Sequence, residues 1–151
     1  MKKIDIFNKL RSSGLRPTKQ RVEIAKFLFE RDKTFHFTVE SLGKLLEKKA
    51  ASKCALATIY NTVHAFISAG HLKEVEVRGN KTYFDTNVSS HHHFYDVETS
   101  ELIDIDAKDV VIEKIPKAPN GKKIKNVEVF INLENWHFVT WFLSQNYYKL
   151  L

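Results

Sequence analysis

The first part of the chain repeats apolar residues at helical spacing. Ile4, Phe7 and Leu10 recur within residues 2–13 with polar residues between them, and Gly14 follows at a usual position for a helix end. Thr18 and Thr38 each precede a similar pattern and are plausible N-caps. The sequence therefore predicts four helices: residues 2–13, Thr18 to about Arg31, Thr38 to the basic stretch 48–53, and about Ala55 to Gly70.

The pattern then changes to alternation. Residues 72–77 alternate as a strand does, residues 78–80 form a turn, and residues 81–84 return as a second strand. Helices followed by a β-hairpin are typical of a winged helix-turn-helix, in which the last helix before the hairpin reads the major groove. Residues 1–84 are thus predicted to form a DNA-binding domain, the alternative being an ordinary helical bundle with a hairpin.

A second, smaller α/β domain is predicted after a hinge at residues 85–90. Strands are expected at residues 93–97 and 101–105, a short helix capped by Asp106, and a strand at residues 124–133. Such a sheet has an exposed edge, so residues 91–133 are expected to pair with a second copy of the chain. The overall fold class is α+β. The apolar tail, residues 134–151, is expected to pack on its own domain or across a dimer; contact with another partner or a membrane surface stays open.

Charge separates the two predicted domains. Residues 1–84 contain 17 Lys or Arg and 8 Asp or Glu, whereas residues 85–151 contain 7 and 10. A basic first half suggests a polyanionic partner, although basic surfaces without a partner are common. Cys54 is the single cysteine, which excludes an internal disulfide and fits a reducing cytoplasm. Neither a signal peptide nor a membrane span is recognisable, so no stable membrane association is expected.

Three consecutive histidines, His91, His92 and His93, are the most unusual feature of the chain. Neutral imidazole is the commonest protein metal ligand and also binds haem iron. In a strand, His91 and His93 point to one face and His92 to the other. His91 and His93 could therefore share one metal ion, and Asp85 and Asp104 could join them if the chain folds back on itself. The alternative is a solvated polar loop.

The fourth predicted helix offers polar side chains for reading DNA. Thr58 and Asn61 can hydrogen-bond base edges, and Tyr60 can bond a phosphate or touch a thymine methyl group. Basic residues near the second helix are expected to meet phosphates; these are Arg16, Lys19 and Arg21.

Several of these motifs resemble the ferric uptake regulator family of bacterial metal-sensing repressors. The resemblance extends over about residues 10–133. Its motifs are residues 15–21 (LRPTKQR), residues 56–60 (LATIY) and the Ala69-Gly70 pair. The Tyr60-Asn61 pair, residues 81–87 (KTYFDTN) and residues 91–95 (HHHFY) resemble the iron response regulator branch in particular.

The resemblance implies a homodimeric regulator, not an enzyme, that binds AT-rich palindromic double-stranded DNA in response to iron status. The signal would be haem at His91, His92 and His93, or a divalent metal. The positions of the family's regulatory metal ligands are occupied here by His36, Asp85, His91, His93 and Asp104. Such a set of three nitrogens and two carboxylates suits Fe²⁺, Mn²⁺ or Zn²⁺.

The chain also departs from the family. Asp96 and Thr99 occupy the places of a cysteine pair that holds a structural zinc in most members, so that zinc is not expected. Cys54 is followed by Ala55 rather than by proline, and is expected to pack as a small apolar residue instead of binding haem. Three alternative functions are compatible with these residues: a peroxide-sensing repressor using the same metal ligands, a metal-dependent hydrolase, and a haem carrier that does not bind DNA.

Overall fold

The computed structural model describes residues 5–49, 54–77 and 81–135. The chain divides into two compact units, with the boundary between Ser89 and Ser90. The predicted α+β class is confirmed, because helices and two small antiparallel or mixed sheets are both present. Within the described residues, no helix has the length and apolar character needed to cross a membrane.

All four predicted helices are found in the first unit. Their bounds are α1 Ile6–Ser12, α2 Lys19–Phe29, α3 Val39–Lys49 and α4 Leu56–Ser68. Thr18 caps α2 by accepting the Arg21 N–H at 3.3 Å, and Thr38 accepts the Ser41 N–H at 3.2 Å at the start of α3. Gly14 (φ +76°) and Gly70 (φ +71°) follow α1 and α4 in the left-handed conformation that favours glycine.

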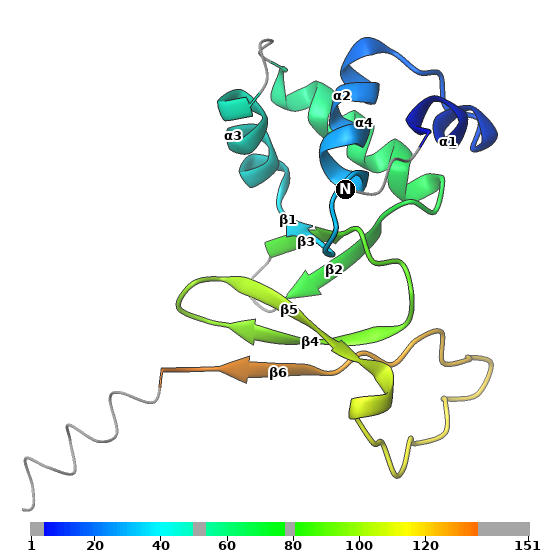
Figure 1. Ribbon diagram of the computed structural model, residues 1–151. Coiled ribbons are helices and arrows are strands. Elements are labelled where there is room, and N and C mark those ends of the chain that lie inside the picture. Colours follow the sequence, from blue (N-terminus) through cyan, green and yellow to red (C-terminus); the bar gives the residue numbers. More distant parts are fainter. Residues whose placement is uncertain (1–4, 50–53, 78–80, 136–151) are drawn as a thin grey trace, which may run out of the picture. The chain divides into compact units, whose positions relative to one another are not determined.

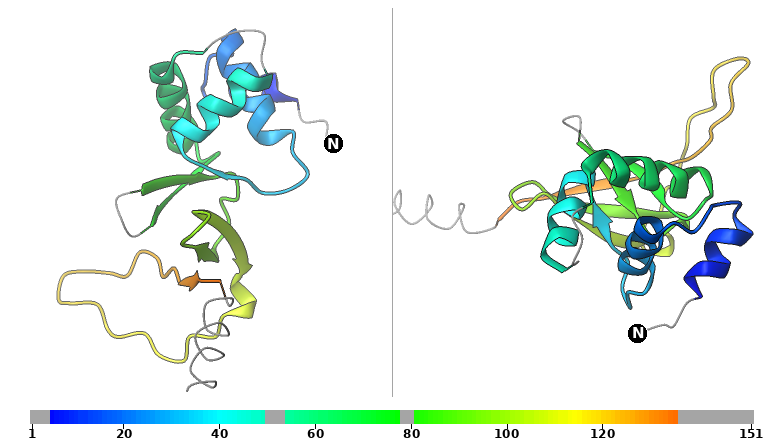
Figure 2. Two further views of the ribbon diagram at one scale, coloured as in Figure 1. Left: turned by 90° about the vertical axis from the view of Figure 1, so that its left-hand side faces the viewer. Right: turned by 90° about the horizontal axis from the view of Figure 1, so that it is seen from above.

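A three-stranded antiparallel sheet completes this unit. Its strands are β1 His36–Phe37, β2 Lys73–Val77 and β3 Lys81–Asp85, in the order β1-β3-β2. The helices lie on one side of this sheet (Figures 1 and 2). Phe37 and Phe66 are among the fully buried side chains of the core between them. The arrangement is that of the predicted winged helix-turn-helix, with β2 and β3 as the wing.

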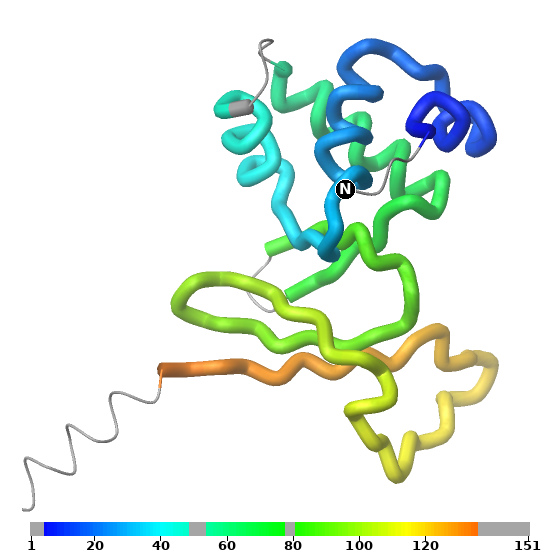
Figure 3. The backbone as a smooth tube through the Cα atoms, viewed as in Figure 1, coloured from blue at the N-terminus to red at the C-terminus, as the bar shows by residue number. Residues whose placement is uncertain are grey.

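The second unit contains a sheet of order β5-β4-β6. Its strands are β4 His91–Asp96, β5 Glu101–Asp106 and β6 Phe130–Leu133. The β4–β5 pairing is antiparallel and the β4–β6 pairing is parallel. Between β5 and β6 the chain makes a long excursion, visible in Figure 3.

Two predicted elements of this unit were wrong. Asp106 does act as an N-cap, but it caps only the short 3₁₀ helix Ala107–Asp109, and residues 110–115 are irregular. β-Branched residues at positions 110–112, followed by Pro116, disfavour a helix there. The predicted strand 124–133 is reduced to β6, because pairing with β4 begins at the register His93↔Phe130. Most of the predicted apolar tail, from residue 136, lies outside the described residues.

Candidate metal centre and nucleic-acid interface

His36 and Asp85 are brought together by the first sheet. They are direct cross-strand partners in the β1–β3 pairing, although they are far apart in sequence. The His36 Nε2 atom lies 3.4 Å from Asp85 Oδ2. The other oxygen of Asp85, Oδ1, accepts the Asn87 N–H at 2.7 Å, which fixes the carboxylate plane at the end of β3. These two predicted ligands therefore form an ordered nitrogen–carboxylate pair in the first unit.

His91 and His93 lie on one face of β4, as alternation predicted. Their Nε2 atoms are 3.0 Å apart, and the rings are nearly perpendicular, at 68°. Asp104 lies opposite His93 in the β4–β5 register. Its Oδ1 is 3.7 Å from His91 Nε2 and 4.0 Å from His93 Nε2. Three of the predicted ligands thus converge within the second unit.

The geometry of this second cluster fits a metal ion. Two imidazole nitrogens bound to one ion at about 2.1 Å lie roughly 3.0 Å apart at the right angle of an octahedral site and roughly 3.4 Å apart in a tetrahedral one, so the observed 3.0 Å is close to what one shared ion requires. The nearby carboxylate oxygen supplies a hard ligand of opposite charge. This donor set fits divalent Mn, Fe or Zn better than Mg or Ca, which prefer oxygen-only ligands.

Glu128 is a functional candidate that the sequence reading missed. Its Oε1 lies 3.0 Å from His93 Nδ1, on the side of the ring away from Nε2. Phe130 stacks on the same imidazole, with a centroid distance of 5.5 Å and an interplanar angle of 16°. One local signal was available in the sequence. Residues two apart in an extended segment lie on the same face, so Glu128 could have been expected on the same face as Phe130.

His92 has a different environment from its two neighbours. It is buried, and its Nδ1 atom accepts the backbone N–H of Val129 at 3.3 Å. In a neutral imidazole with that arrangement the proton is on Nε2, so Nε2 has no lone pair for a metal. This contact gives His92 a role in holding the segment before β6 and does not favour it as a haem ligand.

The exposed face of α4 presents the residues predicted to read DNA. Tyr60 is 52% exposed, Asn61 is exposed and Thr58 is partly exposed. The Tyr60 ring packs on His64, one helical turn later, with centroids 4.2 Å apart. That contact orients the tyrosine without burying it.

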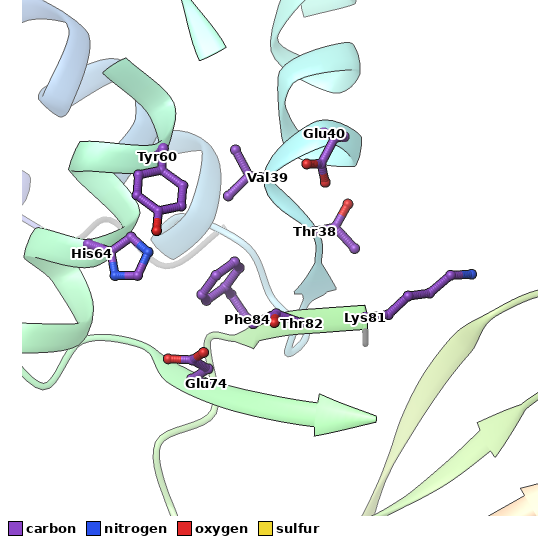
Figure 4. Close-up of a pocket in the computed structure, with 9 residues that line it drawn as sticks. All are labelled: Thr38, Val39, Glu40, Tyr60, His64, Glu74, Lys81, Thr82 and Phe84. Carbon is purple, nitrogen blue, oxygen red and sulfur yellow. The ribbon is translucent and has the colours of Figure 1, made fainter. Parts of the chain in front are cut away.

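A pocket of about 330 Å³ lies beside Tyr60 and His64 (Figure 4). Glu40 and Glu74 both border it, so it does not favour a phosphate group. Its other lining residues are Thr38, Val39, Lys81, Thr82 and Phe84. Phosphate contacts are therefore expected on the basic surface around α2 rather than here.

The predicted phosphate-binding residues around α2 differ in exposure. Arg16 and Lys19 are exposed. Arg21 is only partly exposed, and its Nη1 donates to the Arg16 carbonyl oxygen at 2.7 Å. Arg21 therefore shapes the loop that precedes α2, in addition to adding positive charge there.

Two further predictions concern residues outside these sites. Cys54 packs against the core of the first unit, and burial, followed by the charge of Glu23, raises the pKa of its thiol. Asp96 accepts the N–H groups of Glu98 and Thr99 at 2.9 and 3.0 Å. These bonds lower the pKa of Asp96, with the Thr99 bond contributing most. At this position, where the family resemblance led to the expectation that a structural zinc is absent, the chain closes the β4–β5 turn by hydrogen bonds.

Comparisons with known proteins agree with these features. The model of the ferric uptake regulator family matches residues 12–133. The ferric uptake regulation protein of Pseudomonas putida is 32% identical over 108 residues, covering 71% of this chain and 78% of that protein. The peroxide-responsive repressor of Staphylococcus epidermidis is 30% identical over 95 residues, covering 63% of this chain and 61% of the repressor.

The solved structure of the ferric uptake regulator of Pseudomonas aeruginosa with manganese has the same fold. Its TM-score is 0.63 at 24% sequence identity, and the match covers 88% of this chain and 99% of that one. The winged helix, the nitrogen–carboxylate clusters and the match over residues 12–133 lead to one conclusion. The chain belongs to the ferric uptake regulator family.

Proposed function

We propose that this protein is a homodimeric repressor or activator that binds an AT-rich palindrome in double-stranded DNA when a divalent metal is bound. Members of the family are metal-responsive transcription regulators and not enzymes, and this chain shares that activity. The observation that best supports metal control is the facing pair of Nε2 atoms of His91 and His93, 3.0 Å apart, with Asp104 beside them. A regulator of this kind acts in the cytoplasm.

We further propose that one ion is bound by ligands from both units. His36 and Asp85 would supply two of them, and His91, His93 and Asp104 the other three. The bound ion would supply positive charge that offsets the two carboxylates. Binding by ligands from both units would restrict the conformations of the hinge at residues 85–90, and so set the spacing of the two DNA-reading helices in a dimer.

The donor set suits Fe²⁺, Mn²⁺ or Zn²⁺. The P. aeruginosa relative was solved with manganese, which makes Mn²⁺ a suitable probe that is stable in air. His92 Nδ1 accepts the Val129 N–H, which in a neutral ring places the proton on Nε2 and leaves that nitrogen without a lone pair for iron. Haem at His91, His92 and His93 therefore stays a prediction, with less support than a divalent metal.

The DNA-binding proposal is tested by a gel-shift titration at fixed salt, with an AT-rich palindrome and a random duplex. We expect Mn²⁺ to strengthen binding to the palindrome and EDTA to reverse it. Tyr60→Ala and Asn61→Ala should each weaken palindrome binding by roughly 5- to 150-fold, the usual range for one base contact. Glu47→Ala, at an exposed position on α3, is the matched control. Equal binding of the two duplexes in all conditions would overturn the proposal.

The shared-ion proposal is tested by isothermal titration calorimetry with Mn²⁺, which measures the affinity and the number of ions bound per chain. The wild type should bind one regulatory ion per chain. His36→Ala and His91→Ala should each weaken that same event, and the double variant should lose less than the sum of the two single losses, because the two ligands act on one ion. If His36→Ala leaves affinity and stoichiometry unchanged, the first unit does not contribute to the site.

The similarity to a peroxide-responsive repressor supports a second candidate function. With Fe²⁺ bound, hydrogen peroxide would add one oxygen atom to a ligating imidazole, the second oxygen leaving as water. Intact-mass analysis of the iron form after peroxide treatment measures this directly. An added oxygen on His36 or His91 with loss of DNA binding would favour peroxide sensing, and an unchanged mass would favour metal sensing alone.

A further inference from the structure

The carboxylate of Glu128 lies against the Nδ1 edge of His93, with Oε1 3.0 Å from Nδ1, although the two groups are not aligned as a hydrogen bond. A carboxylate oxygen presents only lone pairs, so this close contact favours a proton on Nδ1 over a lone pair there. In the neutral ring, Nε2 then has the free lone pair. That is the nitrogen which faces His91, the side proposed to bind metal.

The same segment also fixes the ring plane of His93. Glu128 and Phe130 are two residues apart in the segment that leads into β6, and both contact His93: one at its Nδ1 edge and one on its face. The backbone completes the attachment, because the His93 N–H donates to the Val129 carbonyl at 3.0 Å. The His93 side chain is fully buried, so these contacts are shielded from water.

The partner histidine has its proton assigned by the same logic. With a lone pair on His93 Nε2, the 3.0 Å contact between the two Nε2 atoms requires His91 to donate. His93 is therefore the imidazole already prepared to bind an ion in the metal-free protein. His91 must change its tautomer first.

We propose that Glu128 is a positioning residue of the metal site, which holds His93 with Nε2 presented as a metal ligand and adds negative charge behind it. The proposal rests on the proposed metal-dependent function. Carboxylates placed in this way behind a ligating histidine orient the ring and raise its basicity, and their loss typically weakens metal binding by about 10- to 100-fold.

The test uses the full chain with Mn²⁺ as the probe and two substitutions. Glu128→Ala removes the acceptor and should weaken Mn²⁺ binding by about 10- to 100-fold. Glu128→Gln keeps an oxygen acceptor for Nδ1–H without the charge, and should lose less. Glu113→Ala, an exposed acid of the same unit, should bind as the wild type does. The tautomer of His93 is read separately in metal-free protein by ¹⁵N NMR of the imidazole nitrogens.

The proposal expects the Nδ1–H tautomer of His93 in the wild type and in Glu128→Gln, and a shift towards Nε2–H in Glu128→Ala. A wild-type ring protonated only at Nε2, or a Glu128→Ala affinity within twofold of the wild type, would overturn it. If the wild type itself binds no Mn²⁺, the proposed function fails, whereas the tautomer measurement still decides the role of Glu128. If Glu128→Ala does not fold, the Gln variant and the wild-type spectrum decide.

Discussion

Asp85→Asn separates the metal-binding role of this carboxylate from its structural role. The amide keeps an oxygen that can accept the Asn87 N–H, at present 2.7 Å from Asp85 Oδ1, but it loses the charge beside His36. We therefore expect the free energy of unfolding of the metal-free protein to change by no more than about 1 kcal/mol. The metal-bound protein should respond much more strongly.

The size of that response follows from linkage. At a Mn²⁺ concentration of about 100 times the wild-type Kd, binding stabilises the folded state by about 2.7 kcal/mol. For a chain of this size, that is a rise in Tm of roughly 5 to 11 °C. If the lost charge weakens binding by about 100-fold, the same Mn²⁺ concentration stabilises the variant by only about 0.4 kcal/mol. Its Tm should then rise by roughly 1 to 2 °C.

Thermal unfolding followed by circular dichroism, with EDTA and with Mn²⁺, measures both quantities. Glu76→Gln is the matched control, since this exposed acid lies on the same wing and faces away from the core. The control should keep the full Mn²⁺-induced shift. A shift in Asp85→Asn equal to that of the wild type would refute the assignment of Asp85 as a ligand.

Three further predictions concern packing and protonation in the first unit. Gly43→Ala should raise the free energy of unfolding in urea by about 0.5 to 1 kcal/mol, because alanine favours a helix more than glycine does. The new Cβ would meet α4 side chains at 3.4 and 3.5 Å, which is an ordinary contact. A lower free energy of unfolding would show that the interface between α3 and α4 cannot accept a methyl group. Burial, and then the charge of Lys9, lowers the pKa of His71, whose Nε2 lies 2.5 Å from Ser13 Oγ. The folded state therefore favours the neutral imidazole. The contribution of His71 to stability is fully present above the unfolded pKa of about 6.5 and is lost as the pH falls below it. Wild-type stability should therefore fall more between pH 7.5 and 5.5 than that of His71→Gln, and parallel pH curves would contradict this. The raised pKa of Cys54 predicts alkylation by iodoacetamide at pH 7.5 more slowly than for free cysteine, measured by mass; an equal rate would show that the thiol is not shielded.

Local patterns in the sequence were sufficient for the helices of the first unit and for part of the candidate metal site. Helix caps such as Thr18 and Thr38 act through neighbouring N–H groups, so their effect is visible in a few consecutive residues. The alternation of His91 and His93 in one strand is equally local. The Asp104 contact needed only the adjacent strand of a hairpin.

Elements and contacts that depend on segments far apart in the sequence could not be predicted from local patterns. The two-residue strand β1 exists because β3 pairs with it, so His36 was assigned by family resemblance and not by pattern. Glu128 contacts His93 through a parallel pairing that joins segments 35 residues apart in sequence. The helix expected after Asp106 failed because N-capping was given more weight than the β-branched residues and Pro116 that follow.

The closed turn at Asp96 has a consequence for the order in which the second unit assembles. β4 and β5 are joined by a short turn with its own hydrogen bonds, so this hairpin closes only a short loop of chain. β6 must instead close the long segment that begins at residue 107, which costs more chain entropy and takes longer. We therefore expect both histidines and Asp104 to come into register before Glu128 and Phe130 arrive. With the proposed role of Glu128, docking of the edge strand would then be the step that fixes the ring of His93.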